Sequence, residues 1–406
     1  MAIIVLKFGG TSLGDMERIK NAACKVKREV DKGNQIAVVV SAMSGVTNSL
    51  VNYVDQISRF HDAREYDAVV ASGEQVSAGL MALALQEMGV SARSWQGWQI
   101  PIHTSDIHAK ARIEHIEPAN ILQKFQENMV AVVTGFQGLS SQNRITTLGR
   151  GGSDTSAVAL AIALNAERCD IYTDVDGVYT ADPRLVPKAR KLSQVSHETM
   201  LEMASLGAKV LHTRSVELAM NYKLPVQVLS SFMDMPGTFI ISEDAMVEKM
   251  MVSSVAYSRD EAKITLFNVE DKPGIAAAIF GPLTDEAINV DMIIQSVSQN
   301  KKTDMTFTVS REDLNKSIEI LEYQKAKIGY EHLHQDADVV KISVIGVGMR
   351  SHAGVAQKMF QTLSEVGANI QAIATSEIKI STLIHQDYLE KAMQALHHAY
   401  GLDSQG

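Results

Sequence analysis

The chain has 406 residues, of which 46% are hydrophobic and 21% are charged, and its formal net charge is -9. This length exceeds the size at which one hydrophobic core usually stops growing, so we expect at least two domains. The composition excludes a fibrous or disordered protein. The acidic balance argues against a binder of nucleic acid or anionic membranes, because such surfaces need a basic excess. A polyanionic ligand must therefore be met by local positive groups.

The N-terminus and the cysteines give no sign of export. Met1 to Leu6 form a short apolar run that leads directly to Lys7, which fits neither a signal peptide nor a transit peptide. The longest apolar run, Ala157 to Leu164, is far shorter than the roughly 20 residues that a membrane helix needs. Cys24 and Cys169 are far apart and form no CxxC pair, so neither a disulfide framework nor a zinc site is indicated. We expect a cytoplasmic protein with two buried, reduced thiols and no protein-ligated metal.

Short strands alternate with helices through the first half of the chain. The predicted elements, in order, are strand Ile3 to Phe8, helix Glu17 to Lys32, strand Gln35 to Val40, a helix from Val46, strand Met129 to Thr134, helix Ser156 to Leu164 and strand Asp170 to Tyr172. This order is typical of a three-layer α/β fold with a mostly parallel sheet, which binds ligands at the carboxyl ends of its strands. The polar stretch Ser230 to Ser242, with Pro236-Gly237, predicts a domain boundary.

An internal repeat follows this boundary. Lys263-Ile264-Thr265-Leu266 resembles Lys341-Ile342-Ser343-Val344. The residues Gly274, Phe280, Leu283, Asn289 and Ser296 recur 80 positions later as Gly354, Phe360, Leu363, Asn369 and Ser376. Each copy reads as a strand, a loop with glycine, a helix with apolar residues three and four apart, and a second strand. Two similar modules are therefore predicted after the first domain.

The segment Lys7-Phe8-Gly9-Gly10-Thr11-Ser12 stands where a buried strand ends and a helix is expected to begin. Two glycines let the backbone approach an anion closely, two hydroxyls follow, the next helix would offer its positive N-terminus, and Lys7 adds a full charge. These features favour a phosphate-binding turn, although an ordinary tight turn explains the glycine pair about equally well. The segment is not a Walker A loop, because GxxxxGK[ST] is absent.

A second glycine cluster, Thr146 to Ser156 (TTLGRGGSDTS), leads into an apolar helix. Ser153, Asp154 or Thr155 could simply cap that helix, but a cap requires neither three glycines nor an arginine between them. Arg150 offers a planar fork that suits a carboxylate or a phosphate. We therefore interpret this cluster as another anion-binding site.

Three further segments carry weaker signals. Thr173 to Arg184 (TDVDGVYTADPR) follows a strand and is rich in acids and turn formers, but it lacks the later ligands and the terminal glutamate of a calcium-binding EF-hand. We interpret it as a loop at the edge of a nucleotide site. In Gly207-Ala208-Lys209 the lysine could face a phosphate, but a solvated lysine is the simpler interpretation. In Ser72-Gly73-Glu74 the simpler interpretation is an ordinary glutamate at a helix start.

Together these motifs resemble one family closely. KFGGTS from Lys7, SAMSGVTN from Ser41, SGE from Ser72, TTLGRGGSDTSA from Thr146 and TDVDGVYTADPR from Thr173 are similar to the monofunctional aspartokinases, which have the amino-acid-kinase fold. The repeated modules resemble ferredoxin-like ACT domains. The resemblance implies a catalytic domain over residues 1–240, a first ACT domain over 263–338, and a second formed by 247–258 with 340–402, so that the first is nested in the second.

The resemblance implies transfer of the γ-phosphoryl group of ATP, with Mg²⁺, to the side-chain carboxylate of L-aspartate, giving 4-phospho-L-aspartate for lysine, threonine and methionine synthesis. That carboxylate, with a pKa of about 3.9, is already ionised at neutral pH, so no general base is needed. Catalysis would rest on positioning and on neutralising charge at the transferring oxygens. Magnesium would be held mainly by phosphate oxygens and water.

Residue roles follow from the same resemblance. Lys7, Arg150 and Asp154 are the implied catalytic residues. Arg150 would hold the α-carboxylate of aspartate and Glu74 its ammonium group, a pair that rejects simple dicarboxylates. The other implied aspartate contacts are Thr47, Gly151, Gly152 and Ser153. The implied nucleotide contacts are Lys7, Phe8, Gly9, Gly10, Ser41, Thr173, Asp174, Tyr179, Asp182, Arg184 and Lys209.

The ACT modules imply feedback inhibition by lysine, threonine or both, in a homodimer or larger homo-oligomer. The implied effector contacts are Asp271, Pro273, Gly274, Ile275 and Ala276 in the first loop, Asn289, Asp291 and Gln295 after it, and Asn369 and Ile370 in the second module. The second loop, Met349 to Ala356, has Ala353 where the family often has proline, which affects only the expected stiffness of that loop.

Two other functions remain open at this point. Another amino-acid kinase of the same fold, such as one acting on glutamate, would not be expected to carry paired ACT modules. A catalytically silent amino-acid sensor would have no physical need to keep Lys7, Arg150 and Asp154. Fusion to homoserine dehydrogenase is not expected, because no sequence remains for it after the second module.

Overall fold

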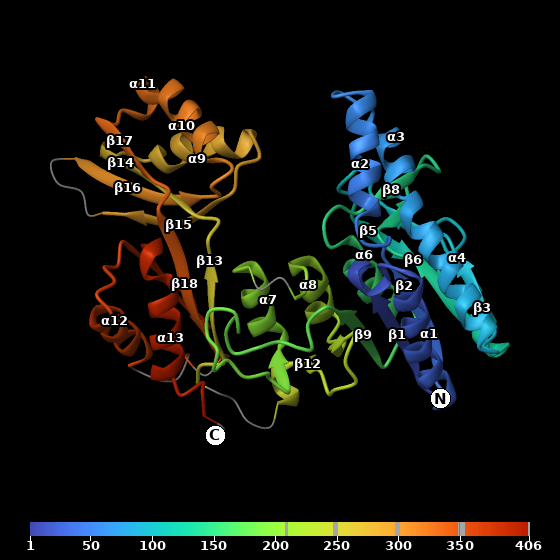
Figure 1. The fold of residues 1–406 in the computed structure, drawn as a ribbon. Helices are drawn as coiled ribbons and strands as arrows, with labels where there is room; N and C mark the ends of the chain where they lie inside the picture. Colours follow the sequence, from blue (N-terminus) through green and yellow to red (C-terminus); the bar gives the residue numbers. More distant parts are fainter. Residues whose placement is uncertain (208–209, 247–250, 297–300, 348, 350–353, 405–406) are drawn as a thin grey trace. The chain divides into compact units, whose positions relative to one another are not determined.

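The computed structural model describes residues 1–207, 210–246, 251–296, 301–347, 349 and 354–404 (Figure 1). The chain forms two compact units. The first consists of Met1–Val178, Lys191–Ser205 and Lys209–Glu248, and the second of Tyr179–Arg190, Leu206–Ala208 and Lys249–Gly406. Two short segments from the middle of the chain thus belong with the C-terminal part rather than with the residues on either side of them.

An eight-stranded sheet forms the centre of the first unit, in the order β10-β12-β11-β9-β1-β2-β6-β3. Its middle strand β1 (Ile3–Phe8) pairs in parallel with β2 (Gln35–Val40) and β9 (Arg168–Thr173). All neighbours are parallel except β11 and β12. The remaining strands are β3 (Ala92–Trp95), β6 (Val130–Thr134), β10 (Gln194–Ser196), β11 (Val226–Ser230) and β12 (Thr238–Ile241).

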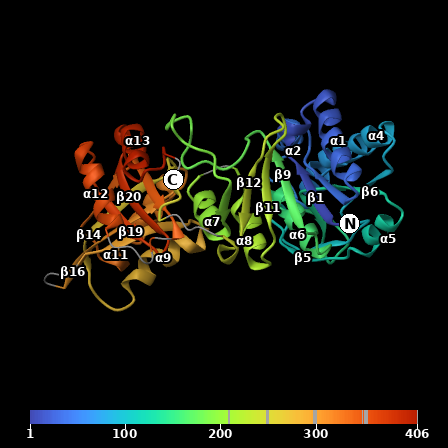
Figure 2. The ribbon, with the colours of Figure 1, turned by 90° about the horizontal axis from the view of Figure 1, so that it is seen from below.

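Helices cover both faces of this sheet. Figure 2 shows α1 (Met16–Asp31) and α4 (Ser72–Glu87) on one side and α6 (Gly152–Ala163) on the other. The further helices are η1 (Gly10–Leu13), α2 (Val46–Ile57), α3 (Ala63–Val70), α5 (Ala119–Gln126), α7 (His197–Ser205), α8 (Thr213–Asn221) and η2 (Glu243–Ala245). The predicted three-layer α/β fold is confirmed. The central strands are near-continuous apolar runs because both of their faces are covered.

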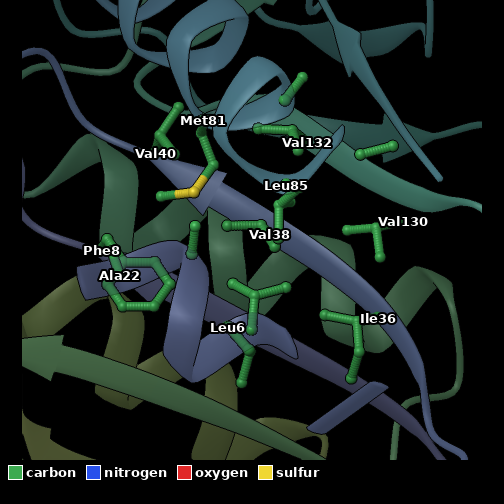
Figure 3. Packing of buried hydrophobic residues seen from close by; sticks show 14 of the residues in the cluster. Leu6, Phe8, Ala22, Ile36, Val38, Val40, Met81, Leu85, Val130 and Val132 are labelled. Carbon is green, nitrogen blue, oxygen red and sulfur yellow. The ribbon is translucent and has the colours of Figure 1, made fainter. Parts of the chain in front are cut away.

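The packing of β1 decides which way Lys7 points. Leu6 and Phe8 lie in the core against α1 and α4, together with Val38 of β2 and Met81 of α4 (Figure 3). Successive side chains of a strand point to opposite faces. Lys7 therefore points to the other face of the sheet, which α6 covers.

A second, small sheet in the same unit leads into the glycine cluster. It has the order β5-β4-β7-β8, with β4 (Ile102–Thr104), β5 (Ile113–Ile116), β7 (Gln137–Leu139) and β8 (Ile145–Thr147). Strand β8 ends directly before Leu148-Gly149-Arg150, so this sheet delivers the arginine to the start of α6.

The second unit contains two four-stranded modules. The first has the order β15-β16-β14-β17, with β14 (Ala262–Glu270), α9 (Ile275–Asp285), β15 (Val290–Gln295), β16 (Lys302–Val309), α10 (Leu314–Tyr323), α11 (Lys325–Ile328) and β17 (His332–Asp336). The second has the order β13-β18-β20-β19, with β13 (Ser254–Ser258), β18 (Val339–Ile345), α12 (Val355–Glu365), β19 (Ala372–Thr375), β20 (Lys379–His385), η4 (Gln386–Tyr388) and α13 (Leu389–Ala399).

The repeat read from the sequence has a structural reason. Gly274 and Gly354 are the residues before α9 and α12, and both have positive φ angles, 89° and 98°. A left-handed backbone at the start of each helix favours glycine at both positions. Strand β13 precedes the first module in the chain but pairs with β18 of the second. The predicted pair of ferredoxin-like modules is confirmed, whereas residues 247–250 of the segment predicted to lead into β13 lie outside the described residues.

Two interpretations of the sequence were wrong. Pro236-Gly237 is not a domain boundary, because it turns the chain between β11 and β12 of the same sheet. A Cβ at Gly237 would overlap the carbonyl of Val228, so glycine is needed there for the close approach of two strands. Cys24 was expected to be buried and is exposed, while Cys169 is buried as expected.

One helical stretch within the described residues, Ala63–Glu87, is long and apolar enough to cross a membrane by length and composition alone. Half of its most apolar window is buried inside the structure, and the stretch includes the buried carboxylates of Asp67 and Glu74. A core helix passes the same test, so this stretch carries no membrane assignment.

Candidate active site

The carboxyl ends of β1, β2 and β9 meet at one edge of the large sheet, where Lys7 and Asp154 form a largely buried ion pair. Lys7 Nζ lies 2.6 Å from Asp154 Oδ1, and the two side chains are 10% and 13% exposed. Lys7 comes from β1 and Asp154 from the first turn of α6, so the pair joins the two predicted anion-binding segments. A cation held in such surroundings acts on nearby charge more strongly than one in open water.

The first glycine turn fits closely against the neighbouring strands. Gly9 N donates to Tyr172 O at 3.3 Å, and a Cβ on Gly9 would lie 3.4 Å from Lys7 Nζ. A Cβ on Gly10 would lie 2.9 Å from Ala42 O, so only glycine fits there without a shift. The turn therefore brings backbone to within contact of the lysine charge, as a phosphate-binding turn requires.

Two details of the predicted turn were wrong. Ser12 is buried and its hydroxyl donates to Tyr172 O at 3.4 Å and accepts from Ser231 Oγ at 2.5 Å, so it holds the fold rather than a ligand. The following α-helix does not offer an open N-terminus, because the Asp15 side chain caps it by accepting from Arg18 N at 2.9 Å. A short 3₁₀ helix, η1, separates the glycines from that cap.

The second glycine cluster presents an uncapped helix start. The N-cap of α6 is Gly151, with φ +67°, and it makes no side-chain cap. Ser153, Asp154 and Thr155 lie within the helix, so the simpler reading of one of them as the cap is wrong. The first backbone N–H groups of a helix lack internal acceptors and favour an anion.

Arg150 lies exposed just before this helix start. Within the part of the chain that the structure describes, its guanidinium group makes no hydrogen bond or ion pair. All the donors of its fork are therefore available to a ligand, and a carboxylate is the group that such a fork binds in two places.

Glu74 reaches the same edge from the start of α4. Its side chain is buried, Oε1 accepts from Ala42 N at 3.0 Å, and Oε2 has no hydrogen-bond partner among the described residues. Burial raises the pKa of Glu74 to about 7. An ordinary glutamate at a helix start would be solvated, so the simpler reading of SGE was wrong. A buried carboxylate oxygen without a partner is suited to a ligand that brings its own positive charge.

The start of α2, which carries Thr47, packs against the start of α4, which carries Glu74. A Cβ on Gly73 would lie 2.7 Å from Ala42 Cβ and 3.2 Å from Val46 Cγ1, so no larger residue fits between these segments. Thr47 is the second residue of α2 and is half-buried.

Besides Lys7, Gly9 and Gly10, four further predicted nucleotide residues lie at this edge of the first unit. Ser41 N donates to Phe8 O at 3.1 Å, directly beside the first glycine turn. The Phe8 ring stacks on Tyr172 in the core, at 4.8 Å between centroids, so only its backbone faces the turn. Thr173 and Asp174 follow β9, and Thr173 Oγ1 donates to Asp174 Oδ1 at 3.2 Å.

Tyr179, Asp182 and Arg184 belong to the second unit. The segment that carries them is closed at its base by Thr180 N donating to Arg190 O at 2.9 Å. Within the second unit Asp182 accepts from Arg184 and from Tyr257 Oη, the latter at 3.1 Å. The remaining predicted contact, Lys209, lies outside the described residues, as does Ala208.

The predicted effector residues lie at two places in the first module. Asp271, Pro273, Gly274, Ile275 and Ala276 lead into α9, and a Cβ on Gly274 would meet nothing within 4 Å. A cavity of about 390 Å³ lies beside the end of α9 and is lined by Asn289 together with Phe280, Thr284, Ala287, Ile288, Val290 and Ile293. In the second module Asn369 and Ile370 precede β19, and residues 350–353 of the second loop, including Ala353, lie outside the described residues.

Asp291 holds the two modules together. Its Oδ2 lies 2.7 Å from Lys341 Nζ, and this buried lysine also lies 2.5 Å from Glu261 Oε1. Asp291 comes from β15 of the first module and Lys341 from β18 of the second. The carboxylate is therefore engaged in an ion pair although Asp291 is exposed, as is Gln295 of the same strand.

The sequence reading missed a residue at the edge of the site. Phe136 follows β6 with a left-handed backbone, φ +67°, which is uncommon for a bulky residue. Its N–H donates to Ser156 Oγ at 3.0 Å, and a Cβ on Gly135 would lie 2.9 Å from Ser153 Oγ. Gly135 and Phe136 therefore form the wall opposite the start of α6. The only sequence signal was a glycine after a strand.

Residues 2–230 match the amino acid kinase family, and residues 263–325 and 342–400 each match an ACT domain. An aspartate kinase of Stutzerimonas stutzeri is 51% identical over 405 residues, which cover 100% of this chain and 98% of that protein. The chain therefore belongs to the aspartokinase family, as the motifs predicted.

Solved structures agree with this fold. The crystal structure of E. coli aspartokinase III in complex with aspartate and ADP, described as the R-state, is 26% identical with a TM-score of 0.81 and covers 98% of this chain and 99% of its own. A structure of the same E. coli enzyme with lysine and aspartate, described as the T-state, has a TM-score of 0.77 and 26% identity, with the same two coverages.

Proposed function

We propose that the protein transfers the γ-phosphoryl group of ATP to the side-chain carboxylate of L-aspartate. The observation that carries this proposal is one edge of the sheet with a buried lysine beside a glycine turn. Next to it, at an open helix start, stands an arginine that has no partner in the described ranges of the chain. The lysine and glycines suit phosphate, and the arginine suits a carboxylate. The related E. coli enzyme, whose structure holds aspartate and ADP, supports the assignment.

Charge neutralisation is the main chemical task in this reaction. Two anions, the carboxylate and the triphosphate, must approach each other, and charge collects on the transferring oxygens. Lys7 is positioned for this task because Asp154 holds its Nζ at 2.6 Å and the glycine turn brings the backbone of Gly9 close to it. Mg²⁺ supplies further positive charge and would be held mainly by phosphate oxygens and water. The described residues contain no cluster of three or more acidic, histidine or cysteine ligands.

Arg150 and Glu74 together suit an amino acid rather than a simple diacid. The unpartnered guanidinium would take the α-carboxylate, and the unpartnered Oε2 of Glu74 would take the ammonium group. Thr47 and the start of α6 (Gly151, Gly152 and Ser153) would complete the contacts to aspartate. A dicarboxylate without the ammonium group would leave Glu74 buried and unpaired, which is costly.

We propose that the glycine turn binds the nucleotide together with Ser41, Thr173 and Asp174 of the first unit. The roles of Tyr179, Asp182, Arg184 and Lys209 stay predictions from the resemblance. A hydroxylamine trap tests the product class. An acyl phosphate reacts with hydroxylamine to give a hydroxamate, so aspartate hydroxamate should accumulate with turnover, and ADP release without hydroxamate would exclude carboxyl phosphorylation.

The raised pKa of Glu74 predicts a pH dependence. Since this pKa is about 7, the carboxylate is mostly ionised at pH 8 and mostly protonated at pH 6. Only the ionised form attracts an ammonium group, so kcat/KM for aspartate is expected to fall about tenfold from pH 8 to pH 6. The aspartate side chain stays ionised over this range. Initial rates at low aspartate and saturating ATP measure the effect.

Glu74→Gln is the matched control for this prediction. The variant should have a low kcat/KM for aspartate that no longer changes between pH 6 and pH 8, while its KM for ATP stays close to the wild-type value. A pH profile that is the same in Glu74→Gln as in the wild type would assign the titration to another group.

We further propose that lysine, threonine or both inhibit through the ACT modules of a homodimer or larger homo-oligomer. The related E. coli enzyme in complex with lysine and aspartate supports lysine as an effector. The open loop at Gly274 and the cavity at Asn289 offer backbone groups and space to a small zwitterion. Such an effector inhibits only if it prefers the conformation with the poorer kinase site, and a coupling of about 1–3 kcal/mol is enough.

Asp291→Ala and Gln295→Ala are expected to relieve this inhibition and to spare kcat measured without effector. Asp291→Ala also removes one partner of the buried Lys341, so its loss of thermal stability should be larger than that of the exposed Gln295→Ala. Initial rates against lysine and threonine, singly and together, measure the effect. No inhibition of the wild type by any amino acid made from aspartate would leave the modules as assembly elements.

A further inference from the structure

Arg214, outside every motif read from the sequence, connects α8 to the backbone of the arginine loop, residues 147–152. Its Nη1 donates to Leu148 O at 2.8 Å, and its Nη2 donates to Ala111 O at 3.1 Å. Leu148 is two residues before Arg150. A planar guanidinium with donors in a fixed fork holds two carbonyls at a set separation, which a lysine cannot do. Burial, together with the nearby charge of Arg112, lowers the pKa of Arg214.

The buried Asp67 also holds the beginning of this loop. This carboxylate accepts from Thr147 Oγ1 at 2.5 Å and from Ala109 N at 3.1 Å. A Cβ on Gly149 would lie 3.2 Å from Ala109 O, so the loop also lies against this neighbouring backbone. Residues 147 and 148 are therefore held by two buried or half-buried side chains, the carboxylate of Asp67 and the guanidinium of Arg214.

His212, two residues before Arg214, contacts the loop just after Arg150. A Cβ on Gly151 would overlap the His212 ring, so the ring lies directly on the backbone after Arg150. The His212 side chain caps α8 by accepting from Arg214 N at 3.4 Å. The start of α8 thus contacts the arginine loop both before and after Arg150.

Arg150 itself has no partner among the described residues, so its place depends on the backbone that carries it. We infer that Arg214 is a positioning residue for the reaction: by holding Leu148 O it sets where the Arg150 guanidinium meets the α-carboxylate of the acceptor. The inference rests on the proposed role of Arg150. A small misplacement of a substrate-orienting group is enough to cost a large factor in rate.

Arg214→Lys and Arg214→Gln test this role in the full-length enzyme. Each is expected to raise KM for aspartate about tenfold or more and to change KM for ATP by less than about twofold. Arg112→Gln is the matched control, because Arg112 is exposed and its side chain makes no hydrogen bond within the described part of the chain. Melting temperatures and far-UV circular dichroism show that the compared proteins are folded. If neither Arg214 variant folds, Arg214 is a determinant of folding and the inference is wrong.

A double-mutant cycle separates positioning from a general structural role. If Arg214 acts through Arg150, its replacement should have less than about a twofold further effect on kcat/KM for aspartate in an Arg150→Ala background. The α-amide of aspartate, which lacks the α-carboxylate, should likewise be used almost equally by the wild type and Arg214→Lys. Additive losses in the cycle, or equal losses with both acceptors, would overturn the inference. A wild type that releases no ADP with aspartate would instead refute the proposed function, and an Arg150→Ala variant with normal aspartate KM would refute only the role of Arg150.

Discussion

Replacing Lys7 with alanine is expected to lower kcat by at least about a hundredfold, because one preorganised charge next to the transferring phosphoryl group is lost. The structure gives the reason for so large an effect. Lys7 is 8% exposed and ion-paired with Asp154, so neither water nor another cation can easily take its place. The measurement is turnover at saturating ATP and aspartate, with the melting temperature recorded alongside.

Lys124→Ala is the control for this substitution. Lys124 is also ion-paired, with Glu127 at 2.7 Å, but it lies on α5 away from the glycine turns. Its loss should leave kcat unchanged. Lys7→Ala leaves Asp154 without its cation, so some loss of stability is expected and the protein should still fold. Turnover within threefold of the wild type would show that Lys7 does not stabilise the transferring charge.

Arg150→Lys is expected to raise KM for aspartate about tenfold or more and to leave KM for ATP nearly unchanged. The substitution keeps the charge and removes the two-pronged geometry, which a point charge cannot replace. Since Arg150 makes no hydrogen bond or ion pair among the described residues, the melting temperature should not change. Separate titrations of the two substrates distinguish the outcomes, and an effect confined to KM for ATP would move Arg150 to the nucleotide.

The fold was predictable where the signal is local. Ile3 to Phe8 and Gln35 to Val40 are continuous apolar runs, and both are strands with the predicted bounds. The strand β12 was missed because it is short, lies next to the edge of the sheet and follows a Pro-Gly turn that reads as a boundary. Nothing in the sequence indicates that Tyr179–Arg190 belongs to the second unit. It depends on contacts such as Thr180 Oγ1 with His397 Nε2, which lie 217 residues apart.

In the candidate site, too, local sequence patterns could be predicted and contacts between distant residues could not. Lys7 and the second glycine cluster with Arg150 were predicted as anion-binding segments, because glycines and a positive charge after a strand form a local sequence pattern. The role of Ser12 was misread because its hydroxyl partner, Tyr172 O, lies 160 residues away. Phe136 was missed because a left-handed backbone at a bulky residue leaves no mark in the sequence. Arg214 reads as an ordinary arginine of a surface helix until its two carbonyl partners are seen.

A coupled assay of ADP release, run with L-aspartate, with L-glutamate and with no acceptor, tests the central claim most directly. The side chain of glutamate is one methylene longer than that of aspartate. With Arg150 and Glu74 holding the α-carboxylate and the ammonium group, the side-chain carboxylate of glutamate would be misplaced relative to Lys7 and the phosphoryl group. We predict rapid, Mg²⁺-dependent ADP release with aspartate and rates near the acceptor-free background with glutamate. ADP release that is equally fast with glutamate, or no faster with aspartate than without an acceptor, would contradict the assignment of an aspartate kinase.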